Sequence, residues 1–182
     1  GTLMYVGEEK KKEPIITTIN YNADYYEKEE IKEITKEIKE KKEDMVRWIN
    51  IENYNVETVE KIGSIFEIHT LLLEDILNLD QRPKIEEFRD HLVLFLKTLS
   101  WNKSKKEIEQ KQVAIILFEG ILISFEESKV PLLNAIINRI EQARGKVRTM
   151  GADYLMYVLL DLLIDNYFSV IDNISEEIEH LE

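Results

Sequence analysis

Two pairs of carboxylates interrupt apolar segments of the sequence, and both could bind a hard metal cation. Glu74 and Asp75 follow three leucines in a mostly apolar helical segment, so at least one of them should reach the surface. Asp161 and Asp165 lie four residues apart among leucines, which places them on one face of a helix where like charges repel. Carboxylates, carbonyls and water are sufficient ligands for Mg²⁺. The simpler interpretation is that Asp161 and Asp165 mark a solvated helix face.

Residues for other kinds of chemistry are scarce. The 182 residues include three histidines (His69, His91 and His180), six glycines that do not cluster, and no cysteine. Widely spaced histidines without cysteine do not favour a transition-metal cluster, and the sequence has no nucleophile elbow or Gly-rich phosphate loop. The formal net charge of −12 has the wrong sign for binding nucleic acid through its phosphates. Cations or basic partners therefore suit the chain better than nucleic acid.

A Gln-Arg-Pro-Lys turn follows the first acidic pair. Pro83 restricts Arg82 to extended geometry, which ends the preceding helix after Leu79. We expect the acids at 86–87 to continue into a short helical turn before the next strand. Arg82 and Lys84 are then available to pair with nearby acids.

The elements that must position these side chains alternate along the chain. Apolar, β-branched segments predict strands over residues 14–21, 44–52, 91–101 and 112–127. Glu119-Gly120 predicts a tight hairpin turn between antiparallel strands 113–118 and 121–125. Helices are expected over 56–66 and 131–144, where apolar residues recur on one face. A charged helix with one isoleucine stripe is expected over 29–44.

A long helix is expected from Gly151 to the end of the chain. About 30 residues at a rise of roughly 1.5 Å each would make a rod roughly 45 Å long. It carries no C-terminal capping signal, so we expect it to continue in a longer protein. The N-terminus resembles no signal peptide, and acids interrupt the apolar runs, so we expect this chain to make no direct contact with a membrane.

Alternating strands and helices predict an α/β fold, an αβα sandwich with a mixed β-sheet between helical layers that ends in a long C-terminal helix. We divide it into an α/β sandwich over 1–148 and an acidic helix over 149–182 that packs on it and leads towards a further helix absent from this chain.

Residues 62–99, IGSIFEIHTLLLEDILNLDQRPKIEEFRDHLVLFLKTL, resemble the cytoplasmic domain of the CorA family of divalent-cation transporters. The family pattern has a histidine before the Leu-Glu-Asp motif, then Gln-Arg-Pro-Lys and an apolar strand. Similarity extends to VRWINIEN (46–53), to the 112–127 hairpin and to ADYLMYVLLDLLIDNYF (152–168), whereas the first 40 residues match loosely. Thr70 stands where the family usually has proline.

This resemblance implies a Mg²⁺-sensing, gating domain of a magnesium/cobalt transporter at the cytoplasmic face of the cell membrane. It implies a homopentamer in which regulatory Mg²⁺ (or Co²⁺) binds between subunits and favours the closed pore. By position, Asp75 matches an acid facing the adjacent subunit, with Glu74 beside it, and Asp161 matches a second intersubunit acid. Asp165 is added from helical spacing. The family's Gly-Met-Asn pore motif is missing here, as are its stalk and transmembrane helices, so we expect no conduction by this chain alone.

Three alternatives remain open. A zinc-transporting relative of the same family has a similar cytoplasmic domain. A Mg²⁺-dependent metallohydrolase would need the two acidic pairs to converge in one pocket. A purely structural interaction domain would use its acids only for solubility.

Overall fold

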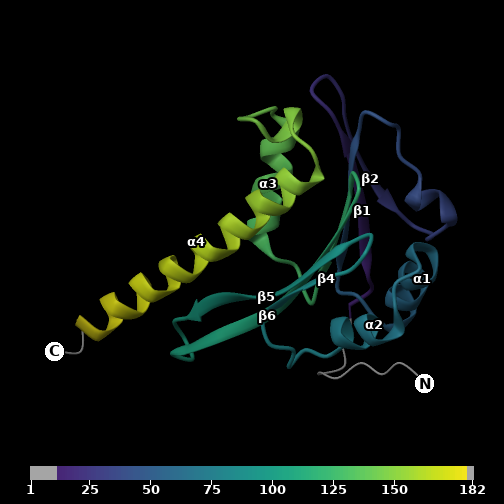
Figure 1. Ribbon diagram of the computed structural model, residues 1–182. Coiled ribbons are helices and arrows are strands. Elements are labelled where there is room, and N and C mark those ends of the chain that lie inside the picture. The colour runs from purple at the N-terminus through teal and green to yellow at the C-terminus, as the bar shows by residue number, and fades with distance from the viewer. Residues whose placement is uncertain (1–11, 180–182) are drawn as a thin grey trace.

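Seven strands form one mixed sheet in the order β2-β1-β3-β7-β6-β5-β4 in a computed structural model that describes residues 12–179 (Figure 1). The strands are β1 (Ile15–Tyr21), β2 (Tyr26–Ile31), β3 (Val46–Glu52), β4 (Lys84–Glu87), β5 (Leu92–Asn102), β6 (Glu107–Phe118) and β7 (Ile121–Glu126). β3 and β7 run parallel, and the other neighbouring strands are antiparallel. The mixed sheet expected from the sequence is confirmed.

Helices cover both faces of this sheet (Figure 1). They are α1 (Val56–Phe66), α2 (Thr70–Leu77), α3 (Pro131–Glu141) and α4 (Ala152–Glu179), with short 3₁₀ helices η1 (Lys36–Lys39) and η2 (Val147–Thr149). α1 and α2 lie on one face, and α3 and α4 on the other. The αβα sandwich ending in a long helix is therefore confirmed, while the division at residue 148 stays a prediction.

The two faces of the sheet carry separate apolar cores because successive side chains of a strand point in opposite directions. In β3, Ile49 and Ile51 are fully buried against α1 and α2, whereas Val46 and Trp48 are buried against α3 and α4. In β7 all six residues are buried, which is expected of a strand between two helical layers.

Buried polar side chains join β3 to β7. Trp48 Nε1 donates to Ser124 Oγ at 2.8 Å, and Ser124 Oγ donates to Asn50 Oδ1 at 2.5 Å. Glu126 is hydrogen-bonded to Asn50, and its Oε2 accepts from the Val130 backbone N–H at 2.6 Å, directly before α3. These bonds pair polar groups that would be costly to bury alone.

The helix expected over residues 29–44 is wrong. Its first part lies in β2, an exposed, charged edge strand paired with β1, and only η1 is helical. Asn22 Oδ1 accepts from the backbone N–H groups of Asp24 and Tyr25, which closes the turn from β1 into β2. The isoleucine stripe does pack on the core, with Ile38 buried in η1, but without forming a continuous α-helix.

The short helical turn expected at 86–87 is also wrong. These residues lie in β4, where Lys84 pairs with Phe95 and Glu87 with Leu92 of β5. α2 ends at Leu77, two residues before the expected end. Pairing with a long neighbouring strand therefore overrides the local helical preference of the two glutamates.

The turn after β6 is confirmed, because Gly120 has the left-handed φ of 72° and β6 and β7 pair antiparallel on either side of it. α4 is also confirmed, and Figure 1 shows it projecting beyond the sheet beside the β5–β6 hairpin.

By length and composition alone, α4 could cross a membrane, since its most apolar window has a mean hydropathy of 1.4. This composition alone does not test the expectation that the chain makes no direct contact with a membrane, which stays a prediction. A helix in a protein core can have the same composition, and 33% of this window is buried against the rest of the protein.

Glu126 makes folding depend on pH. Burial raises its pKa from 4.5 to about 7, so the folded state holds a proton that the unfolded state has lost between these values. The stability from this proton is fully present below about pH 4.5 and is lost as pH rises through about 7.

We expect Glu126→Gln to flatten this dependence and to raise the free energy of unfolding at pH 8 by up to ~3 kcal/mol. Urea unfolding at several pH values tests this, with exposed Glu119→Gln as control. Parallel curves for Glu126→Gln and wild type would contradict it.

Candidate metal centre

The first acidic pair lies on the outer side of α2. His69 caps the start of this helix, with its Nδ1 accepting from the Leu71 backbone N–H at 3.2 Å. Four apolar residues of α2 are buried against the sheet, so Glu74 is exposed and Asp75 is half-buried at the edge of the contact. The buried residues are Leu72, Leu73, Ile76 and Leu77.

The C-terminal end of α2 is anchored to the sheet. Tyr54 Oη and Gln112 Nε2 both donate to the Ile76 carbonyl at 2.9 Å. Lys97 Nζ donates to the Leu79 carbonyl just beyond the helix, and burial lowers the pKa of Lys97. Since free carbonyls at a helix end need partners, these three side chains fix the position of α2 and of its acids.

Asp75 has a lysine partner within its own chain. Lys84 Nζ lies 2.8 Å from Asp75 Oδ2 and 2.7 Å from Glu86 Oε1, and 5.2 Å from the centroid of the Phe95 ring. Burial lowers the pKa of Lys84, but the hydrogen bonds to both carboxylates outweigh it, so the net pKa is raised. The expectation that Lys84 pairs with a nearby acid is confirmed.

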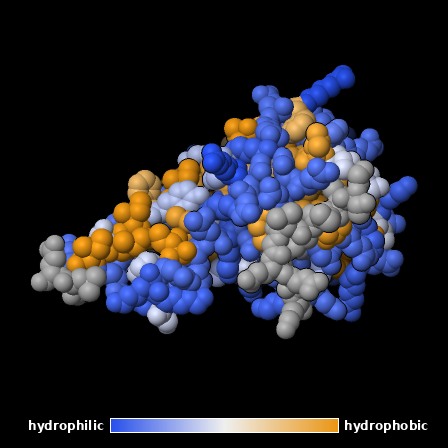
Figure 2. Space-filling model, turned by 90° about the horizontal axis from the view of Figure 1, so that it is seen from below, coloured by the Kyte–Doolittle hydropathy of each residue, from blue (hydrophilic) through white to orange (hydrophobic). Residues whose placement is uncertain are grey.

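The second acidic pair lies on α4 and points away from the sheet. Leu155, Leu159 and Leu163 face the core, whereas Asp161 and Asp165 are exposed. Among residues 12–179, neither aspartate has an ion-pair partner. α4 contains no lysine or arginine at all. This surface therefore combines unpaired negative charge with apolar side chains, and Figure 2 shows apolar groups along the projecting helix.

Two hydrogen bonds hold α4 against β5 near these acids. Asn166 Oδ1 accepts from the Leu99 backbone N–H at 3.1 Å, and Tyr167 Oη donates to the Lys97 carbonyl at 2.5 Å. Because Asn166 and Tyr167 directly follow Asp165, these bonds fix which face of α4 is turned outward.

The structure does not bring the two acidic pairs together. α2 and α4 cover opposite faces of the sheet, and the part of the chain from 12 to 179 contains no group of three or more acids or histidines placed to hold a metal. These four residues therefore do not converge in one pocket, as the metallohydrolase alternative would require. Each pair offers at most two carboxylates, which fits Mg²⁺, because this ion often binds through one or two carboxylates and keeps several waters.

The described histidines have structural surroundings. His91 is stacked on Phe88 with ring centroids 4.6 Å apart, and its Nδ1 lies 2.7 Å from Asp90 Oδ1. His69 caps α2 as described above. His180 lies outside the described residues.

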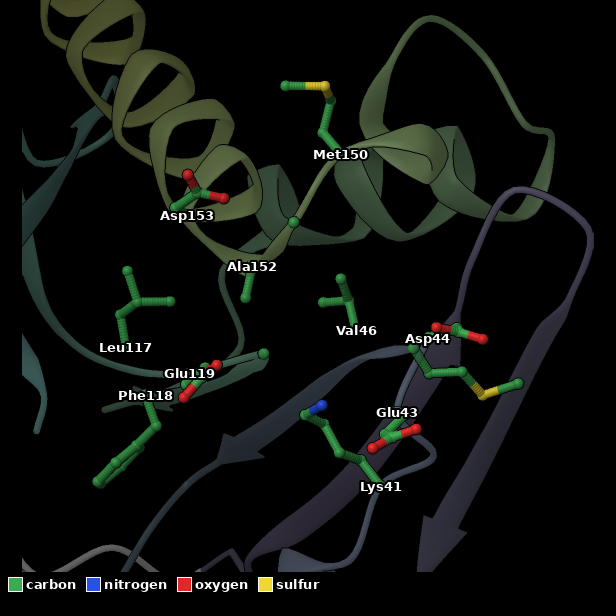
Figure 3. Close-up of a pocket in the computed structure, with 13 residues that line it drawn as sticks. Lys41, Glu43, Asp44, Val46, Leu117, Phe118, Glu119, Met150, Ala152 and Asp153 are labelled. Carbon is green, nitrogen blue, oxygen red and sulfur yellow. The ribbon is translucent and has the colours of Figure 1, made fainter.

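A pocket of about 530 Å³ lies elsewhere, between the start of β3, the β6–β7 turn and the N-terminus of α4 (Figure 3). Lys41, Glu43, Asp44, Glu119 and Asp153 are its charged residues. None of the four predicted site acids lines this pocket, so it is separate from the candidate metal centre.

The family comparison agrees with the motif at α2. The family model described as "CorA-like Mg2+ transporter protein" matches residues 28–182 of this chain. This chain belongs to the CorA family. It is 34% identical, over its whole length, to the cobalt/magnesium transport protein CorA of Thermotoga maritima. It covers 52% of that protein, so it spans about half the length of this CorA relative.

Solved structures share the fold. The soluble domain of CorA from Methanocaldococcus jannaschii matches with a TM-score of 0.67 at 19% identity, over 91% of this chain and 62% of that one. The cytoplasmic domain of ZntB from Vibrio parahaemolyticus matches with a TM-score of 0.62 at 14% identity, over 91% of this chain and 63% of that one. At these identities the similarity shows a common fold.

Sequence reasoning missed the residues that position these acidic pairs. Tyr54, Gln112, Asn166 and Tyr167 act on backbone groups far away in the sequence, and no local spacing indicates such contacts. Asn166 and Tyr167 are polar groups in a mostly apolar stretch of α4, whereas Tyr54 lies in the loop between β3 and α1 and Gln112 ends a polar stretch of β6.

We expect that Asp75 can be replaced without unfolding this CorA-family domain. The side chains of Asp75 and Lys84 are 32% and 29% exposed, so solvent screens their ion pair. We expect Asp75→Asn to lower the free energy of unfolding by less than about 1 kcal/mol. Urea unfolding near neutral pH measures this, with Glu57→Gln, which breaks the exposed pair with Lys61, as control. A loss several times larger would mean that Asp75 is a fold determinant and not a free ligand.

Proposed function

We propose that this chain is the cytoplasmic regulatory domain of a CorA-type magnesium/cobalt transporter, at the cytoplasmic face of the cell membrane. Its membership of the CorA family carries the proposal, since the similar Thermotoga maritima protein is named as a cobalt/magnesium transport protein. In this function the domain is not an enzyme. It regulates a pore formed by stalk and transmembrane helices of the same protein.

The proposed ligands are Asp75 with Glu74 on α2, and Asp161 with Asp165 on α4. Asp161 and Asp165 are exposed, and Asp75 is half-buried beside exposed Glu74. Among residues 12–179 no group of three or more acids or histidines is placed to close a metal site within one subunit. A neighbouring subunit of a homopentamer would supply the remaining ligands. These four acids would bind and orient a regulatory Mg²⁺ or Co²⁺, which would supply positive charge at the interface.

Charge explains how such binding could act on the pore. Each chain carries a formal charge of −12, and α4 contributes acids without any basic residue. Neighbouring acidic faces repel one another unless a cation lies between them. If the cation binds the closely packed, closed assembly better than the open one, its loss shifts the population towards the open state.

Sedimentation velocity of this 182-residue chain, with and without millimolar Mg²⁺, tests the interface. We expect Mg²⁺ to promote self-association, and Asp75→Asn or Asp161→Asn to weaken that effect, because each removes a ligand from a shared site. Glu119→Gln, which removes an equal charge from the exposed β6–β7 turn, serves as the control and should behave as wild type.

Two outcomes would contradict the proposed ligands. One is self-association that does not depend on Mg²⁺, and the other is Mg²⁺-dependent self-association that is unchanged in both aspartate variants.

A further inference from the structure

Asp75, the carboxylate proposed to bind a metal ion on α2, already has the ammonium group of Lys84 beside it. Lys84 Nζ contacts Asp75 Oδ2 at 2.8 Å, the same kind of oxygen that a divalent cation would need. β4 presents this lysine to α2 across the edge of the sheet, in register with Phe95 of β5. Lys84 and a divalent cation would therefore compete for Asp75.

The ammonium group has a second partner. Glu86 Oε1 lies 2.7 Å from Lys84 Nζ, and Glu86 is two residues along β4, on the same side of the strand. The Phe95 ring centroid, 5.2 Å away, adds a cation–π contact. Lys84 could leave Asp75 and remain paired with Glu86 over this ring, without any movement of the backbone.

Charge balance favours such an exchange for a divalent ion. In the present arrangement one positive charge is shared by the two carboxylates of Asp75 and Glu86. A divalent cation on Asp75 leaves the ammonium to neutralise Glu86 alone. A monovalent ion interacts with the carboxylate about half as strongly at equal distance and has no such advantage over the ammonium already present.

We propose that Lys84 is a built-in counter-cation that sets the affinity of Asp75 for cations and selects divalent over monovalent ions, with Glu86 receiving the ammonium when the ion binds. This inference rests on the proposed function of Asp75. It assigns to Lys84 and Glu86 roles that differ from ligation, because both act through the position of one ammonium group.

Mg²⁺ binding to the 182-residue chain, measured by isothermal titration calorimetry at constant ionic strength, tests the role of Lys84. Lys84→Met keeps an aliphatic stem against Phe95 and removes the competing charge. We expect it to raise the affinity for Mg²⁺ about 2- to 5-fold, the range that corresponds to a partly exposed ion pair. Lys61→Met is the matched control, since Lys61 is ion-paired to Glu57 and its loss changes the net charge equally.

Two results would overturn the proposal. One is an equal affinity of Lys84→Met and Lys61→Met for Mg²⁺, which would mean that only net charge matters. The other is a Lys84→Met chain that binds no Mg²⁺ at all. The ¹⁵N resonance of the Lys84 ammonium provides a direct readout, because Mg²⁺ should shift it in wild type and leave it unchanged in Asp75→Asn.

Glu86→Gln tests the second partner. Without Glu86 the ammonium has only Asp75, so we expect a weaker affinity for Mg²⁺ in the wild-type background. In the Lys84→Met background the same substitution should have a markedly smaller effect, because there is no ammonium left to receive. Equal effects in both backgrounds would show that Glu86 acts independently of Lys84 and would remove it from the proposal.

Asp75→Asn separates the two levels of inference. If Asp75→Asn leaves Mg²⁺ binding unchanged, the proposed ligand itself is wrong. If Asp75→Asn abolishes Mg²⁺ binding while Lys84→Met and Lys61→Met have equal affinities for Mg²⁺, Asp75 is supported as a ligand and only the proposed role of Lys84 is wrong.

Discussion

The parallel pairing of β3 with β7 is the constraint on which the rest of the fold depends. It joins an antiparallel group, β2-β1-β3, to a second antiparallel group, β7-β6-β5-β4. A parallel neighbour can be reached only by a long crossover, and here the crossover contains α1, α2 and the β4–β5–β6 meander. The hydrogen-bonded chain from Trp48 through Ser124 to Asn50 spans this junction inside the core.

This junction also decides where the acids lie. The crossover places α2 on one face of the sheet, and the chain leaving β7 passes to the other face to form α3 and α4. Asp75 and Asp161 are consequently on opposite outer layers of one subunit. In the proposed pentamer such a placement suits a ring, because each subunit of a cyclic assembly uses two different surfaces to contact its two neighbours. Two incomplete carboxylate sites on opposite faces would then be complementary.

The sequence predicts the central part of the sheet well and its edges poorly. β-branched, apolar runs and the Gly120 turn identify β3, β5, β6 and β7, and the clearest case is β7, which is buried along its whole length and mostly apolar. Both wrong predictions of secondary structure concern the edge strands β2 and β4, which stand at the two ends of the sheet. Their sequences are charged and locally compatible with helix. What makes them strands is pairing with β1 and β5, a non-local interaction that residue spacing does not encode.

The edge strand β4 also determines the electrostatic surroundings of Asp75. Sequence reasoning identifies the acid and the availability of Lys84, but the contact between them depends on the register in which Lys84 faces Phe95. A slip of one residue would turn Lys84 and Glu86 to the other side of the sheet and bring Ile85 towards α2. Asp75 would then lose its counter-cation without any change in its own helix. The electrostatics of this site are therefore a property of strand pairing, which is why the acidic motif alone could not predict them.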